Sequence, residues 1–208
     1  DKEFIRINKL LFFDILKLTH IKSGYVCLPI QGSGTFSLEA TFSTLLNKNS
    51  RILVLTNGVY GNRLINICKK IGKNFLILKF NEDEPMSIEK IEKTLLENKS
   101  ISHISLVHCE TSSGILNPLY EISQICKKYK KKLIVDAMSS FGGIEINFQK
   151  NYIDALISSS NKCLEGIPGF SFSIIKKTSL SKAKNNANSL SLDLFDQWKG
   201  FIKNGQWR

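Results

Sequence analysis

The stretch KLIVDAMSSFGG occupies residues 132–143, and ALISSSNK follows at residues 155–162. Each begins with a short apolar run and ends in polar residues, which is typical of a buried strand followed by a loop. The first run ends at Asp136, and the second leads through three serines to Lys162, 162 − 136 = 26 positions later. We therefore expect a carboxylate and a lysine at the ends of two buried strands.

Similar apolar runs recur along the chain, and helical patterns fill the gaps between them. We predict strands over residues 25–30, 51–56, 75–80, 103–107, 132–135 and 155–158. We predict helices over residues 37–47, 60–71, 87–97, 119–130 and 190–208, with an exposed connection over 182–189. This alternation predicts an α/β fold, a mostly parallel sheet with flanking helices in three layers. Ligands of such sheets bind outside the carboxyl ends of the strands.

The net charge of +11 raises the question of a nucleic-acid partner. The densest basic cluster closes a predicted helix before a strand and consists of Lys127, Lys128, Lys130, Lys131 and Lys132. We interpret it as a solvated helix end, because the sequence shows neither a basic-aromatic stripe nor a recognition helix. A nucleic-acid module is therefore disfavoured, although a positive field also attracts small anionic substrates.

The five cysteines form no Cys-x-x-Cys pair, and their odd number argues against a closed disulfide framework. No apolar run approaches the roughly 20 residues of a membrane span, and no secretory leader opens the sequence. We expect a soluble, cytoplasmic protein without a membrane partner. We expect no metal site.

Polar residues follow each predicted strand. The first group, QGSGTF at residues 31–36, lies between a strand and a helix, so backbone N–H groups and a helix dipole would point at an anion. A plain tight turn is the alternative, because the segment lacks the Lys-Ser/Thr ending of a nucleotide-binding P-loop and the third glycine of a dinucleotide fingerprint.

Asp136 and Lys162 have ordinary explanations when each is taken alone. Asp136 could cap a helix, and Lys162 could be a surface lysine. A strand-end carboxylate can also pair with a protonated pyridine nitrogen, and a lysine in a partly desolvated pocket can attack an aldehyde. An anion loop, a carboxylate and a strand-end lysine in this order supply the principal contacts for pyridoxal 5′-phosphate.

With these residues in place, the sequence resembles the class-V, fold-type-I aminotransferases that depend on pyridoxal 5′-phosphate. DAMSSFGG at residues 136–143 matches the aspartate motif, and SSSNK at 158–162 matches the motif of the Schiff-base lysine. The resemblance implies that Lys162 is the catalytic residue. It implies cofactor contacts from Ser33, Gly34, Thr35, Tyr60, Thr111, Asp136, Asn161 and Lys162.

The individual roles follow from the same resemblance. Ser33, Gly34 and Thr35 fall where the family binds the cofactor phosphate, and Asn161 matches a polar residue that assists there. Tyr60, in NGVYGNR at residues 57–63, falls where related enzymes stack an aromatic ring on the pyridine, although a core tyrosine is the ordinary alternative. Thr111 matches a hydroxyl residue near the ring.

Three neighbouring residues stay outside the predicted site. Glu110 and His108 could position the residues that contact the cofactor, or they could be purely structural. Met138 could touch the second face of the ring, but a core methionine is the more common explanation.

Within the family, the sequence is most similar to the subgroup that uses 2-aminoethylphosphonate and pyruvate. ETSSGILNP at residues 110–118 and SLSLDLFDQW at 189–198 carry this similarity. The implied reaction gives phosphonoacetaldehyde and L-alanine. Another class-V enzyme, such as an alanine:glyoxylate aminotransferase, and a noncatalytic domain that keeps the cofactor cradle are the alternatives.

The family is longer than this chain at both ends. We therefore expect residues 1–208 to be the large, cofactor-binding domain of a longer protein, without an amino-terminal segment and a smaller carboxyl-terminal domain. The resemblance implies a homodimer with active sites at the subunit interface. We accordingly expect the 208 residues alone to be inactive.

Overall fold

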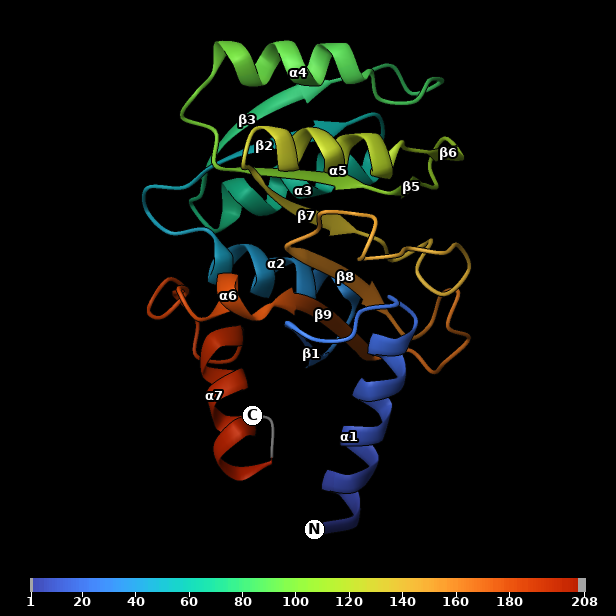
Figure 1. Ribbon diagram of the computed structural model, residues 1–208, viewed down its shortest axis with the longest axis vertical. Helices are drawn as coiled ribbons and strands as arrows, with labels where there is room; N and C mark the ends of the chain where they lie inside the picture. The colour runs from blue at the N-terminus through green and yellow to red at the C-terminus, as the bar shows by residue number, and fades with distance from the viewer. Residues whose placement is uncertain (1, 206–208) are drawn as a thin grey trace.

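A seven-stranded sheet forms the centre of the computed structural model, which describes residues 2–205 (Figure 1). In their spatial order the strands are β1 (Tyr25–Gln31), β9 (Phe170–Lys176), β8 (Ala155–Ser159), β7 (Lys132–Asp136), β4 (His103–Val107), β2 (Arg51–Thr56) and β3 (Asn74–Lys79). Strand β9 runs antiparallel to both of its neighbours, whereas the pairs from β8 to β3 are parallel. The mostly parallel sheet of the prediction is confirmed.

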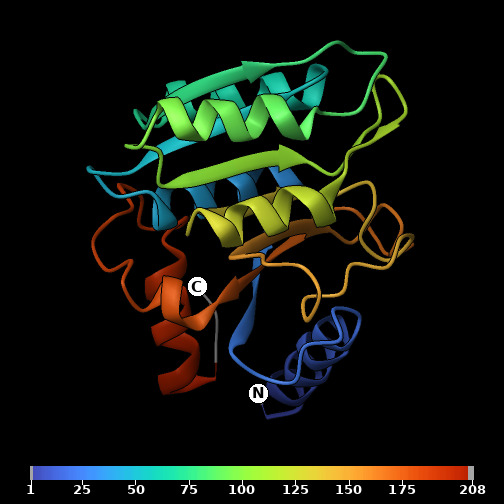
Figure 2. The same ribbon diagram turned by 45° about the horizontal axis from the view of Figure 1, so that its top comes forward.

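Helices cover both faces of the sheet, which gives the three predicted layers (Figure 2). One face packs against helices α2 (Gly34–Leu45), α3 (Val59–Lys70), α6 (Lys177–Leu180) and α7 (Leu194–Asn204). The other face packs against α1 (Lys2–Lys17), α4 (Ile88–Glu97) and α5 (Leu119–Lys128). No helix within residues 2–205 has the length and apolar character needed to cross a membrane.

The six predicted strands are present, but the sequence pattern did not reveal β9, helix α1 or the short hairpin of β5 (Cys109–Glu110) and β6 (Ile115–Leu116). In β9, Ser171 and Ser173 are fully buried, so the strand lacks an unbroken apolar run. Their hydroxyls hydrogen-bond to Ser37 at 2.8 Å and Thr41 at 2.7 Å, both in α2. The predicted helix over 190–208 is α7 in part, and residues 206–208 lie outside the described residues.

Helix α2 starts earlier than residue 37, with Ser33 as its N-cap and Gly34 as its first residue. Gly34 leaves room there for the Met138 side chain, because a Cβ atom would overlap its Sδ. The first turn of α2 therefore packs directly on the segment that follows β7.

The carboxyl ends of β2, β4, β7 and β8 meet at one edge of the sheet, since these four strands are parallel. Asp136 is the last residue of β7, and the segments that follow β2, β4 and β8 carry Tyr60, Glu110 and Lys162. The sheet thus brings to one edge residues that are up to about a hundred positions apart, 162 − 60 = 102.

Candidate active site

Asp136 ends β7 and is only 2% exposed. Its Oδ1 accepts a hydrogen bond of 3.0 Å from the backbone N–H of Met138, while Oδ2 has no hydrogen-bond donor among the described residues. Burial raises the pKa of the Asp136 carboxyl from 3.8 to about 6, and the Met138 N–H and the Arg63 charge limit that rise. The site therefore contains a buried carboxylate with one oxygen open to a further donor.

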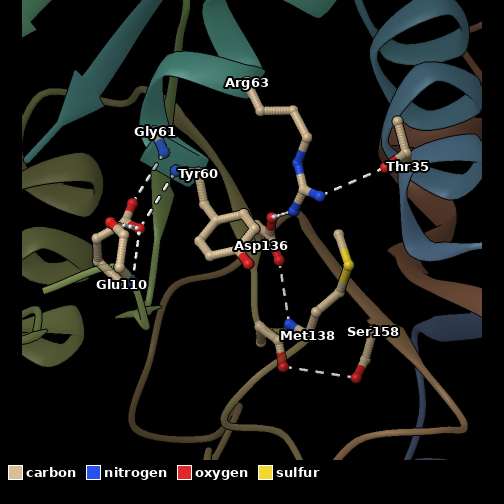
Figure 3. A network of polar contacts seen from close by, with 10 residues as sticks. Thr35, Tyr60, Gly61, Arg63, Glu110, Asp136, Met138 and Ser158 are labelled. Atoms are coloured by element: carbon tan, nitrogen blue, oxygen red, sulfur yellow. Dashed lines mark hydrogen bonds and ion pairs between the residues drawn. The ribbon is translucent and has the colours of Figure 1, made fainter. Parts of the chain in front are cut away.

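Arg63 on α3 reaches across this carboxylate and was not foreseen from the sequence (Figure 3). Its Nη2 lies 3.6 Å from Asp136 Oδ2, which is an ion pair but too long for a hydrogen bond. Its guanidinium carbon lies 4.6 Å from the centre of the Tyr60 ring. Its Nη1 lies 3.5 Å from Thr35 Oγ1. One side chain thus connects three of the predicted cofactor contacts.

Tyr60 lies in the first turn of α3, whose position is fixed by Glu110 from the neighbouring hairpin (Figure 3). The Glu110 carboxylate is fully buried and accepts hydrogen bonds from the backbone N–H groups of Tyr60 at 3.2 Å and Gly61 at 2.9 Å. Ser112 Oγ donates to the same carboxylate at 2.6 Å. Since the N-cap Gly58 has no side chain, Glu110 serves as the helix cap from a distant part of the chain.

The predicted anion loop lies at the amino terminus of α2, next to these groups. Ser33 is exposed, Gly34 is buried and Thr35 is half-buried. The N-terminal end of a 12-residue helix carries free backbone N–H groups and a partial positive charge. An anion in contact with this turn would lie beside Thr35 and the Arg63 guanidinium.

Lys162 and Asn161 lie in the loop after β8, and both are exposed. Residues 161–169 lie largely at the surface, so the partly desolvated pocket considered for Lys162 is not formed by residues 2–205 alone. The loop is nevertheless anchored next to Asp136. Cys163 Sγ donates to the carbonyl of Ser139 at 3.4 Å, and fully buried Ser158 donates to the carbonyl of Ala137 at 3.5 Å.

The remaining candidates divide into exposed and structural residues. Thr111 is exposed in the turn between β5 and β6. His108 is buried and shares a hydrogen bond of 2.9 Å with Ser140, and burial lowers its pKa to about 4, so it is neutral at pH 7. Met138 is 8% exposed and packs into the hydrophobic core against the first turn of α2. Its position beside Asp136 is visible in Figure 3.

The family model described as aminotransferase class-V matches residues 14–189, which is most of the chain. This chain belongs to the class-V aminotransferase family. The resemblance expected from the aspartate and lysine motifs is thereby confirmed. Membership of this family implies pyridoxal 5′-phosphate as the cofactor.

Curated relatives match the chain over its whole length. A protein of Pseudomonas putida (strain W619) is 44% identical over 208 residues, and one of Pseudomonas fluorescens (strain Pf0-1) is 45% identical. Both are named 2-aminoethylphosphonate–pyruvate transaminase. The match covers all of this chain but 56% of each relative, so the chain spans little more than half of their length.

Solved structures share the fold. The ureidoglycine–glyoxylate aminotransferase of Bacillus subtilis matches with a TM-score of 0.89 and 24% identity, covering 100% of this chain and 55% of that one. The alanine–glyoxylate aminotransferase of Nostoc sp. matches with a TM-score of 0.87 and 23% identity, covering 97% of this chain and 53% of that one. At this identity the likeness establishes the fold-type-I architecture.

Glu110→Ala is predicted to destabilise the protein by about 3 kcal/mol, because two buried backbone N–H groups lose a charged acceptor. Glu121→Ala, which removes an exposed carboxylate from α5, is the matched control and should change stability by less than about 0.5 kcal/mol. Urea unfolding in the absence of cofactor measures both. Equal effects of the two substitutions would contradict the capping role of Glu110.

Asp136 should make the stability of the cofactor-free protein depend on pH. Its folded pKa of about 6 exceeds the ordinary value of 3.8, so the folded state binds the proton more tightly than the unfolded state. The resulting stability is fully present below pH 3.8 and is lost as the pH rises through 6. Relative to Asp136→Asn, the free energy of unfolding of the wild type should fall by about 3 kcal/mol as the pH rises from 3.8 to 6.

Urea unfolding at a series of pH values tests this dependence. Asp83→Asn, which changes an exposed carboxylate, serves as the control and should leave the wild-type curve in place. A difference between wild type and Asp136→Asn that stays constant with pH would show that Asp136 is not the titrating group.

Proposed function

We propose that the natural protein containing this chain transfers the amino group of 2-aminoethylphosphonate to pyruvate, giving phosphonoacetaldehyde and L-alanine. The observation that carries the proposal is the 43–45% identity to curated relatives of that name across all 208 residues. Because the chain spans 56% of those relatives, the proposal concerns the whole protein and not residues 1–208 alone.

The geometry at the strand ends fits pyridoxal 5′-phosphate. Asp136 Oδ2 is buried and lacks a hydrogen-bond donor among the described residues, which a protonated pyridine nitrogen would supply. Tyr60 presents an aromatic face for stacking beside this carboxylate. Ser33, Gly34 and Thr35 would hold the phosphate at the amino terminus of α2. Bound there, the cofactor supplies an aldehyde carbon and a ring that withdraws electrons from the reacting carbon.

Lys162 would form the covalent link to the aldehyde carbon and later carry a proton between the substrate carbon and that carbon. Its loop is anchored to the segment after Asp136 by the Cys163–Ser139 contact, and strand β8 before it by the Ser158–Ala137 contact, which supports this role. Asn161 would assist at the phosphate, and Thr111 would contact the ring from the hairpin. Asp136 would keep the ring nitrogen protonated and so favour the loss of the substrate proton.

We assign residues 1–208 to the large domain and place the contacts to the phosphonate and carboxylate groups partly in the additional length of the relatives. Lys162 is exposed in this chain, and we expect it to be covered by the additional length of the relatives and by a second subunit of a homodimer. The five free cysteines support a reducing, cytoplasmic setting.

Lys162→Ala in the full-length protein should reduce transamination at least about a thousandfold, since it removes both the covalent link and the proton carrier. Borohydride treatment should attach the cofactor to Lys162 in the wild type, and peptide mass analysis locates the adduct. Lys182→Ala, at an exposed lysine of the same chain, is the control and should leave both results unchanged. An adduct on a different lysine would exclude the proposed role.

The substrate proposal is tested by steady-state kinetics of the full-length protein. The kcat/KM for 2-aminoethylphosphonate with pyruvate should exceed those for serine or alanine with glyoxylate at least about a hundredfold, because a site built to pair with a phosphonate discriminates strongly against donors without it. Comparable values would assign the protein to another subgroup of the family.

A further inference from the structure

Arg63 makes the contacts that the cofactor ring would make. Its guanidinium carbon lies over the Tyr60 ring, 4.6 Å from the ring centre, and its Nη2 lies 3.6 Å from Asp136 Oδ2. A protonated pyridine ring in the proposed site would use the same aromatic face and the same oxygen. Both groups are planar, carry one positive charge and donate N–H groups in their own plane.

The two cations would compete for this place, because both would use the Tyr60 ring and the same carboxylate oxygen. Asp136 Oδ1 accepts from the Met138 N–H, whereas Oδ2 has no hydrogen-bond donor among the described residues and faces Arg63. We propose that Arg63 is a stand-in for the cofactor ring. In the free protein Arg63 compensates the buried Asp136 charge, and it is displaced when the cofactor binds. This inference rests on the cofactor site of the proposed function.

The contact is suited to displacement because it is loose. At 3.6 Å the ion pair lacks the hydrogen bond of roughly 2.7–2.9 Å that an N⁺–H donor makes with a carboxylate at close range. Arg63 Nε is also buried without a hydrogen-bond partner among the described residues. A ring nitrogen that approaches Oδ2 to hydrogen-bonding distance gains an interaction that Arg63 does not make here.

The displaced side chain has a neighbouring place to go. Thr35 Oγ1 lies 3.5 Å from Arg63 Nη1, in the first turn of α2 where the phosphate would bind. Arg63 is 31% exposed in its side chain, so its movement does not require unpacking of the core. Removal of Arg63 therefore has two opposing effects on cofactor binding. It frees the place of the ring, which strengthens binding, and it removes a positive charge near the phosphate, which weakens binding.

A double-mutant cycle separates these two effects. The ligand is 4-deoxypyridoxine 5′-phosphate, which has the ring and the phosphate but no aldehyde, so Lys162 forms no covalent link with it. Its Kd is measured by calorimetry for the full-length wild type, R63Q, D136N and the double variant. R63K is included as a second variant, which keeps the charge but loses the planar fork.

The stand-in role predicts that the effect of R63Q depends on Asp136. Relative to its effect on the Kd in the D136N background, R63Q in the background with Asp136 intact should lower the Kd about fivefold, because only there does the ligand have to displace the Arg63–Asp136 ion pair. R63K should give an intermediate value. K70Q, which removes an exposed charge from the same helix, should have no effect in either background.

The outcomes distinguish this inference from the proposed function. If R63Q changes the Kd by the same factor in both backgrounds, Arg63 serves only the phosphate or the fold. This result would overturn the inference and leave the cofactor site intact. A wild type that does not bind the ligand would overturn the cofactor site and the inference together.

Discussion

The burial of a negative charge at the end of β7 is the constraint around which the candidate site is organised. Asp136 has lost almost all contact with water, and the penalty for burying an unpaired carboxylate reaches several kcal/mol. The parallel strands place the amino ends of α2 and α3 beside it, where Thr35, Tyr60 and Arg63 gather. Much of the local structure can be understood as preparation for a positive charge at Oδ2.

A second buried carboxylate at the same edge has the opposite character. Glu110 is satisfied on both oxygens by three backbone N–H groups and a hydroxyl, so it has little capacity left for a ligand. Asp136 has one hydrogen bond and an open oxygen. The number of hydrogen-bond donors therefore distinguishes the two carboxylates, although both are buried. Glu110 is fully used by the fold, whereas Asp136 has an oxygen that can accept a further hydrogen bond.

The fold and the centre of the site were accessible from sequence because they depend on local patterns. Unbroken apolar runs located β2, β4, β7 and β8, and Asp136 was found at the end of one of them, whereas Tyr60 was singled out by the resemblance to the family. Strand β9 was missed since its buried serines are balanced by hydroxyls from α2, which lie more than a hundred residues earlier in the chain. Arg63 and Glu110 act through spatial neighbours from other strands, and no spacing along the sequence encodes such contacts. The exposure of Lys162 likewise depends on what packs over its loop.

The contact between Gly34 and Met138 has a consequence for molecular recognition. The first turn of α2 rests on the side chain of Met138, two positions after Asp136, and Gly34 contributes no side chain of its own to this contact. The amino terminus of α2 and the Asp136 carboxylate are therefore held apart by a packed contact, the one between Gly34 and Met138. A molecule that contacted both groups would have to carry its anionic and cationic parts at a matching separation. A larger residue at position 34 would displace either the Met138 side chain or the first turn of α2, and in both cases it would disturb the packing that sets this separation.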